Sequence, residues 1–283
     1  MVTRKTVSLN QIKLSYLDWQ TTGEPVLLLH GLADHALVWT AVGEQLADTY
    51  HPVAVDMRGH GDSDKPDSGY DFDTVVADLV QLMEHLNWPA AHMVGHSWSG
   101  KVATYWATRQ PERFLSMVLV DPIFVYGVPG IFRLTFPLFY GTLPFLKGMG
   151  PFPNWDAAIQ QGKQMKQYRS WNQLQESVFC ESLEEKADGK VSSKFTQTAR
   201  DEIFDAVLRI PGLTQKIQTP SLFMQPESGI NRFDWQLKPY QEFLETLTVQ
   251  SVSGNHWAFL VEPDAFSQAL INFLKTLEPD SAH

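Results

Sequence analysis

A serine stands at the centre of the segment GHSWSG, residues 95–100 of the chain. An apolar run at 91–94 precedes it and predicts a buried strand, and residues 101–107 predict a helix. A sharp turn from strand to helix presents a serine hydroxyl on an exposed corner, above the free N–H groups of the helix N-terminus. The hydroxyl of Ser97 could therefore attack a carbonyl carbon if a base removed its proton.

Four segments of the sequence together resemble the α/β-hydrolase superfamily. They are LLHGL at 28–32, DMRGHGDSD at 56–64, the serine segment at 95–100, and GNHW at 254–257 followed by Glu262 and Pro263. Any one could arise by chance, but all four in this order cover nearly the whole chain except its middle. The resemblance implies an α/β fold with a serine nucleophile at the turn. The departure at Ser99, where glycine is more usual, is mild because serine is also small.

A base must take the proton of the serine, and nine histidines are available. The resemblance implies that the loop after the last strand carries the base, and His256 follows the strand predicted at 248–252. His96 is adjacent to Ser97 and should point away from its hydroxyl. His30 is expected to brace the loop that follows it. We therefore predict His256 as the base.

An acid must fix the tautomer of this histidine and stabilise its charged form. Most members of the superfamily carry the acid after the strand predicted here at 221–225, where Gly229 occupies the expected position. Some branches carry it at the end of the strand after the nucleophile, and Asp121 stands there. We predict Asp121 as the acid, with Glu227 or Asp234 as alternatives. If Asp121 has no catalytic role, we expect it to cap a helix or turn before Pro122.

Donors must also face the oxygen that becomes negative when the carbonyl is attacked. The backbone N–H groups of Leu32 and Trp98 are the expected donors, and both side chains can shape the pocket as well. Three charged residues lie around a glycine-rich turn: Asp56, Arg58 and Asp64. Such a turn with paired charges favours a structural brace beneath the site.

Other chemistries of the same fold fit the sequence less well. Epoxide hydrolases and haloalkane dehalogenases use a carboxylate nucleophile at the turn, where this chain has Ser97. The sequence has no cysteine cluster for a metal and no Gly-x-Gly-x-x-Gly or other phosphate-binding loop. We expect neither a cofactor nor a metal.

Composition favours a globular protein with a small-molecule substrate. The 283 residues are 43% hydrophobic and 19% charged, which allows one large α/β domain with an insertion. A net charge of −10 without any basic run argues against a nucleic-acid partner. The N-terminus lacks the apolar core of a signal peptide, and no window approaches the roughly 18 apolar residues of a membrane span. The single cysteine, Cys180, is expected to be structural and fits a cytoplasmic location.

The elements that must position these residues alternate along the chain. Residues 6–9 and 12–17 predict a hairpin, and short apolar runs predict strands at 26–30, 52–56, 91–94, 117–121, 221–225 and 248–252. Helical spacing of apolar residues predicts helices at 72–86, capped by Asp71 or Asp73, and at 263–277. Continuous apolar strands between amphipathic helices predict an α/β fold, a mostly parallel, doubly wound sheet covered on both faces.

Residues 122–212 break this alternation and match the position of the cap or lid in the superfamily. We therefore predict a hydrolase core at 1–121 and 213–283 and a helical cap at 122–212. The part at 131–149 is rich in aromatic and aliphatic residues, and 156–208 is polar and helical, with Ser193 as a helix cap. Aromatic residues of 131–149 are expected either to line a pocket for an apolar part of the substrate or to form ordinary core.

These features predict a serine hydrolase that acts by acyl transfer on a small or medium carboxylic ester, a thioester or a carbon–carbon bond. Ser97 would form the acyl-enzyme, His256 would move the proton, and water would complete the reaction. The alternative is a small-molecule receptor of the same fold with slow or no turnover. The same triad would also permit perhydrolase or cofactor-free haloperoxidase side activity. The sequence names neither the substrate nor the oligomeric state, because specificity resides in the cap.

Overall fold

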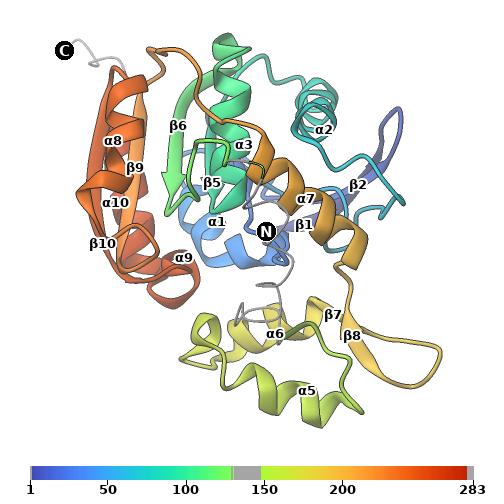
Figure 1. Ribbon diagram of the computed structural model, residues 1–283. Helices are drawn as coiled ribbons and strands as arrows, with labels where there is room; N and C mark the ends of the chain where they lie inside the picture. The colour runs from blue at the N-terminus through green and yellow to red at the C-terminus, as the bar shows by residue number, and fades with distance from the viewer. Residues whose placement is uncertain (1, 129, 131–147, 279–283) are drawn as a thin grey trace.

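The computed structural model of the protein describes residues 2–128, 130 and 148–278. An eight-stranded sheet runs through its centre in the order β1-β2-β4-β3-β5-β6-β9-β10 (Figure 1). β1 pairs antiparallel with β2, and β2 pairs antiparallel with β4, whereas the other neighbouring strands are parallel. The strands are β1 (Thr3–Ser8), β2 (Lys13–Asp18), β3 (Pro25–Leu29), β4 (His51–Asp56), β5 (Ala91–His96), β6 (Phe114–Val120), β9 (Ser221–Ser228) and β10 (Leu247–Asn255).

Helices cover both faces of the sheet. Alternate residues of β3 show why, because Leu27 and Leu29 join the apolar cluster under α2, α3 and α8, while Val26 and Leu28 join the cluster under α1, α9 and α10. All four side chains are fully buried. The predicted mostly parallel, doubly wound sheet is thus confirmed. The covering elements are η1 (Ala36–Trp39), α1 (Thr40–Leu46), α2 (Phe72–His85), α3 (Trp98–Ala107), η2 (Pro111–Arg113), α8 (Asp234–Phe243), α9 (Ala258–Val261) and α10 (Pro263–Lys275).

The helix ends follow from local sequence. Asp71 caps α2 by accepting a hydrogen bond from the backbone N–H of Thr74 at 3.0 Å, and Pro263 occupies the first turn of α10. Helix α3 begins at Trp98, three residues before the predicted start, because it begins at the serine turn itself. Among the described residues, no helix combines the length and the apolar character that crossing a bilayer would require.

The described residues between β6 and β9 add no strand to the large sheet. Their elements lie together beyond one end of the sheet, apart from α7, which returns across the core (Figure 1). β7 and β8 pair with each other in a separate two-stranded sheet, and Val191 of β8 also forms a bridge with Phe152. These elements are α5 (Trp155–Gly162), η5 (Lys166–Tyr168), α6 (Gln173–Glu181), β7 (Leu183–Glu185), β8 (Val191–Ser193) and α7 (Gln197–Arg209).

Two expectations for this inserted stretch concern Ser193 and the aromatic-rich part at 131–149. Ser193 does not cap a helix: it lies in β8, and its hydroxyl accepts a hydrogen bond from the backbone N–H of Phe195. Thr196 caps α7 instead, because several small polar residues precede this helix and sequence spacing does not separate them. Most of the aromatic-rich part, residues 131–147, lies outside the described residues.

Lys101 ties the beginning and the end of the inserted stretch to α3. Its buried ammonium group donates hydrogen bonds to the carbonyl oxygens of Tyr126 at 3.0 Å and Val207 at 2.6 Å. Burial lowers the pKa of Lys101 to about 7. The two chain segments also pair directly, because the N–H of Gly212 donates to the carbonyl oxygen of Val125 at 2.7 Å.

Candidate active site

Ser97 occupies the turn between β5 and α3 in a strained conformation. Its φ of 57° and ψ of −118° lie in a region that residues with side chains rarely adopt. The backbone N–H of Ser97 donates to the carbonyl oxygen of Val120 at 3.0 Å, which holds the turn against the neighbouring strand β6. The hydroxyl therefore sits on a corner fixed by the sheet.

The residues two positions before and after Ser97 explain how the turn is accommodated. A Cβ atom at Gly95 would lie 2.8 Å from the carbonyl oxygen of Ser99, so no side chain fits there. Ser99 does fit, because its hydroxyl lies 2.9 Å from the carbonyl oxygens of both Leu29 and His96 and can donate to either. This contact provides a partner for the polar group that replaces the more usual glycine.

His256 and Asp121 lie in contact at the ends of two strands. The Nδ1 of His256, which directly follows β10, donates to Oδ2 of Asp121 at 2.7 Å. Burial alone would raise the pKa of the Asp121 carboxyl, but hydrogen bonds from His256 and from the chain at Ile230 and Asn231 hold it below its usual value. Asp121 is thus a buried carboxylate that fixes the proton of the imidazole on Nδ1.

The loop after β9 supplies the remaining partners of the carboxylate. The N–H of Ile230 donates to Asp121 at 2.8 Å, and Asn231 donates through its backbone N–H at 3.1 Å and its side chain at 2.8 Å. A Cβ atom at Gly229 would lie only 2.5 Å from Oδ2 of Asp121. Glycine at 229 therefore leaves the space that the carboxylate fills.

The alternative acids lie elsewhere. Glu227 and Asp234 are both exposed, and neither is hydrogen-bonded to His256. Asn231, in contrast, was not singled out by the sequence. The only signal for it was a polar residue in the loop beyond the strand predicted at 221–225.

His30 braces the loop that carries Leu32. Its Nε2 accepts a hydrogen bond from the N–H of Met57 at 3.0 Å, which leaves Nδ1 protonated to donate to the carbonyl oxygen of Gly31 at 2.7 Å. Burial lowers the pKa of His30 to about 4, so the ring is neutral near pH 7. Leu32 and Trp98 line the same pocket as Ser97. Trp98 is the first residue of α3, so its backbone N–H has no partner within the helix.

The charged residues of the segment at 56–64 lie outside this pocket. Asp56 accepts hydrogen bonds from the N–H of Ala36 and from the guanidinium of Arg4, each at 2.7 Å. Arg58 pairs with buried Asp78 through two contacts of 2.8 and 3.0 Å. These contacts join the segment at 56–64 to β1, η1 and α2 and agree with a bracing role.

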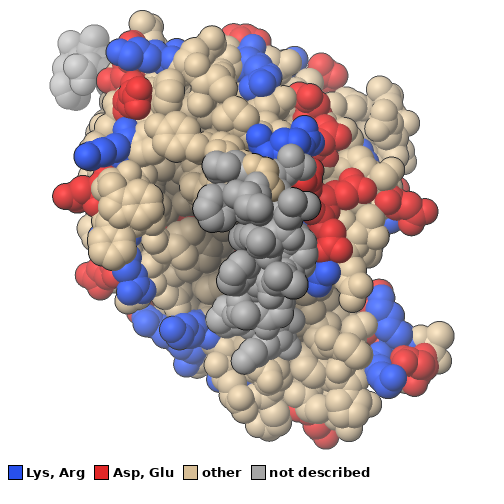
Figure 2. Space-filling model, viewed as in Figure 1, with Lys and Arg blue, Asp and Glu red and all other residues tan. Residues whose placement is uncertain are grey.

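The pocket beside Ser97 and His256 has a volume of about 610 Å³. One part of its wall is apolar and comes from the loop after β6, from α7 and from the loop after β9; another part is polar and comes from α5 and η5. The face of the molecule drawn in Figure 2 is hollowed near its centre, with uncharged residues along one side of the hollow. The apolar wall contains Ile123, Phe124, Ile203, Phe204, Val207 and Ile230, and the polar wall contains Gln161, Gln164, Lys166 and Gln167.

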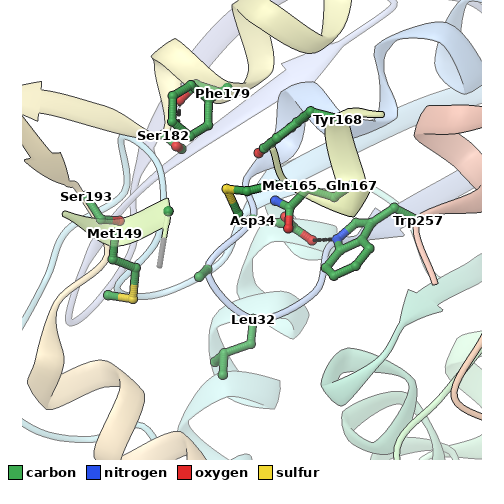
Figure 3. Close-up of a pocket in the computed structure, with 12 residues that line it drawn as sticks. Leu32, Asp34, Met149, Met165, Gln167, Tyr168, Phe179, Ser182, Ser193 and Trp257 are labelled. Atoms are coloured by element: carbon green, nitrogen blue, oxygen red, sulfur yellow. Dashed lines mark hydrogen bonds between the residues drawn. The ribbon is translucent and has the colours of Figure 1, made fainter. Parts of the chain in front are cut away.

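A second, much smaller cavity of about 20 Å³ adjoins this pocket (Figure 3). The two share Leu32, Asp34 and Trp257 among their lining residues, and Met149 lines the smaller one. Asp34 was not singled out by the sequence, although it stands only two residues after Leu32. Both cavities therefore meet at the loop after β3.

Comparisons with known proteins agree with this fold. The family described as alpha/beta hydrolase fold matches residues 24–263. The chain is 31% identical over 140 residues to "Soluble epoxide hydrolase" of Corynebacterium sp. (strain C12), a match that covers 48% of this chain and 46% of that protein. This chain thus spans less than half of that relative's length.

Two further similarities extend over most of the chain. "Fluoroacetate dehalogenase" of Burkholderia sp is 24% identical over 280 residues, covering 89% of this chain and 88% of that protein. The solved structure of E-2-(acetamidomethylene)succinate hydrolase superimposes with a TM-score of 0.79 at 22% identity, covering 97% of this chain and all of that one. With a family match over residues 24–263 and this shared architecture, the chain belongs to the α/β-hydrolase family.

Proposed function

We propose that the protein is a serine hydrolase that cleaves carboxylic esters, with Ser97 as nucleophile, His256 as base and Asp121 as acid. The observation that supports this most directly is the 2.7 Å hydrogen bond between His256 and Asp121, in a pocket that Ser97 also lines. A buried carboxylate on Nδ1 leaves Nε2 of the imidazole free to accept the serine proton.

The reaction proceeds in two stages in this proposal. Nε2 of His256 takes the proton of Ser97 as Oγ attacks the ester carbonyl, and the N–H groups of Leu32 and Trp98 stabilise the oxyanion. His256 then returns the proton to the departing alcohol, which leaves an acyl group on Ser97. A water molecule, deprotonated by His256, attacks this ester, and His256 gives the proton to Oγ of Ser97 as the acid is released.

The serine separates this proposal from the reactions named for the similar epoxide hydrolase and dehalogenase. If a serine hydroxyl opened an epoxide or displaced a halide, the product would be an ether on the enzyme. A histidine and a water molecule do not cleave an ether, so the enzyme would stop after one turnover. An acyl group on Ser97, in contrast, is readily hydrolysed, which favours esters and related acyl compounds.

The pocket supports a substrate with an apolar portion. Its volume of about 610 Å³ is within the usual range of roughly 300–1,000 Å³ for small-molecule sites. We further propose that residues 122–212 act as a cap over the core formed by 1–121 and 213–283. The residues of α5, η5 and α7 in the pocket wall support this division.

A receptor of the same fold with slow turnover remains the second candidate, and two measurements separate it from an esterase. A fluorophosphonate probe should label the wild type at Ser97 and leave Ser97→Ala unlabelled. The wild type should then hydrolyse many equivalents of p-nitrophenyl butanoate. A labelled protein that stops after one equivalent of p-nitrophenol would contradict esterase function and support the receptor.

A further inference from the structure

Asp34 is a carboxyl group that the proposed hydrolysis does not use. It lies between β3 and η1, on the loop that also carries Leu32. The residue is only 5% exposed, yet it lines both the pocket beside Ser97 and the smaller cavity (Figure 3). A buried carboxyl in a pocket wall is costly unless hydrogen bonds satisfy it.

The protein itself satisfies only part of this group. One oxygen, Oδ2, accepts a hydrogen bond from Nε1 of Trp257 at 3.1 Å and lies 3.8 Å from Nδ1 of His96. Within residues 2–128, 130 and 148–278, Oδ1 accepts no hydrogen bond and no lysine or arginine pairs with the carboxyl. Burial raises the pKa of Asp34 to about 7, and the Trp257 bond and nearby His256 offset only part of this effect.

Asp34 is not a second acid for the base. Nδ1 of His256 already donates to Asp121, and the histidine nitrogen recorded beside Asp34 belongs to His96. The ring of His96 lies between these groups, with its centre 4.4 Å from that of His256. Burial lowers the pKa of His96 well below its usual value, so this ring stays neutral and does not compensate the carboxylate.

The surroundings of Asp34 place it at the polar end of the pocket. Gln167 of η5 lines both cavities, as do Asp34 and Trp257 (Figure 3). The aliphatic and aromatic side chains of α7 and of the loop after β6 form a different part of the wall. A ligand that fills the pocket would therefore meet apolar side chains with one portion and polar groups, including Asp34, with another.

We propose that Asp34 is a specificity-determining residue that accepts a hydrogen bond from a donor on the substrate: an amide N–H, a hydroxyl or a protonated amine. The substrate class is then an ester with an apolar portion and a hydrogen-bond donor on its other portion. This inference rests on the proposed function for its reaction, but the binding of the donor can be measured separately.

The experiment compares pairs of esters that differ in one donor, three pairs of butanoates and one pair with the donor in the acyl group. 2-Acetamidoethyl butanoate is paired with its N-methylacetamido analogue, and 3-hydroxypropyl butanoate with 3-methoxypropyl butanoate. For the charged donor, the 2-(dimethylammonio)ethyl ester is paired with the 2-(trimethylammonio)ethyl ester, so that both carry a positive charge. Ethyl N-acetyl-β-alaninate and its N-methyl analogue place the amide donor on the acyl side. The pair with the largest ratio identifies the kind of donor.

We expect wild-type kcat/KM to favour the donor in at least one pair. Asp34→Asn should lower that ratio by about tenfold to a hundredfold, because the asparagine oxygen would keep the Trp257 bond and turn an N–H group toward the donor. Asp34→Ala removes the acceptor and should lower the ratio as well. Asp188→Asn, which alters an exposed carboxylate near the β7–β8 turn, should leave the ratio unchanged.

Binding to Ser97→Ala, measured by calorimetry, repeats the comparison without turnover. Donor preference in binding that is lost in Ser97→Ala/Asp34→Asn would support the role of Asp34 even if no ester were hydrolysed, an outcome that would contradict only the proposed function. Equal ratios in the wild type and both Asp34 variants, in turnover and in binding, would overturn the inference, as would a wild type that favours no donor in any pair.

Discussion

Replacing Gly229 with alanine should weaken the contact between Asp121 and His256 without touching either residue. The added Cβ atom would lie 2.5 Å from Oδ2, 2.8 Å from Cγ and 2.9 Å from Oδ1 of Asp121. The carboxylate cannot simply swing away, because donors from His256, Ile230 and Asn231 hold it. Either the loop or the carboxylate must move, and both movements lengthen bonds to Asp121.

The size of the effect follows from the bond that is disturbed. A hydrogen bond to a charged group contributes about 1.5–3 kcal/mol, and each 1.36 kcal/mol of barrier corresponds to a factor of ten, so kcat/KM should fall by about tenfold to 150-fold. This is less than the roughly 10⁴-fold loss expected when the acid of such a triad becomes an amide.

The assay is hydrolysis of p-nitrophenyl butanoate by Gly229→Ala, with the melting temperature measured in parallel. Ser228→Ala is the matched control, because it alters an exposed side chain one residue earlier, at the end of β9. It should retain wild-type kinetics. Gly229→Ala with wild-type kcat/KM would refute the reasoning, since Asp121 would then tolerate displacement.

Three further predictions concern individual side chains. Asp121→Asn should lower turnover about 10⁴-fold by favouring the wrong tautomer of the histidine, whereas Glu227→Gln, at an exposed carboxyl, should do far less; steady-state kinetics showing the reverse order would contradict the assignment. Ser97→Ala should abolish ester hydrolysis while circular dichroism shows a folded protein, and activity within tenfold of the wild type would exclude a serine mechanism. Asp34→Asn should raise the melting temperature more at pH 8 than at pH 4. Burial raises the pKa of Asp34 from 3.8 to about 7, so between these two pH values the native state keeps a proton that the unfolded chain releases. The free energy of unfolding of the wild type therefore falls as the pH rises from 4 to 8, by at most about 4 kcal/mol, at 1.36 kcal/mol per pKa unit. Equal gains at both pH values would contradict this.

The strands and the turn that carries Ser97 could be predicted because each depends on a pattern of consecutive residues. Strand β9 shows the limit of such patterns: the apolar run suggests an end at 225, but the strand continues to Ser228. Pairing with β10 extends it, since Pro226 lies opposite Val252 and Ser228 opposite Asn255. Helix α8 was not predicted, because Pro239 interrupts the pattern of a helix.

The contacts of the site are harder to predict, because they join residues far apart in the chain. The hydrogen bond between Asp121 and His256 spans 135 positions, and the resemblance to a family supplied the expectation. The hydrogen bond from Asn231 to the same carboxylate spans 110 positions, and a polar residue in the loop after a predicted strand is too weak a signal to identify it. Asp34 meets Trp257 across 223 positions, and its burial depends on elements that pattern alone does not place.

The contacts around Lys101 have a consequence for the entropy of the chain. Tyr126 and Val207 are held by one nitrogen atom, and Val125 pairs with Gly212, so the intervening stretch leaves and re-enters the core at a single place. The core already holds these ends together, and the cost of closing a flexible loop rises by only about 0.6 kcal/mol for each doubling of its length. The stretch that forms much of the pocket wall could therefore lengthen, shorten or be replaced over generations, while the strand ends beneath it kept their geometry.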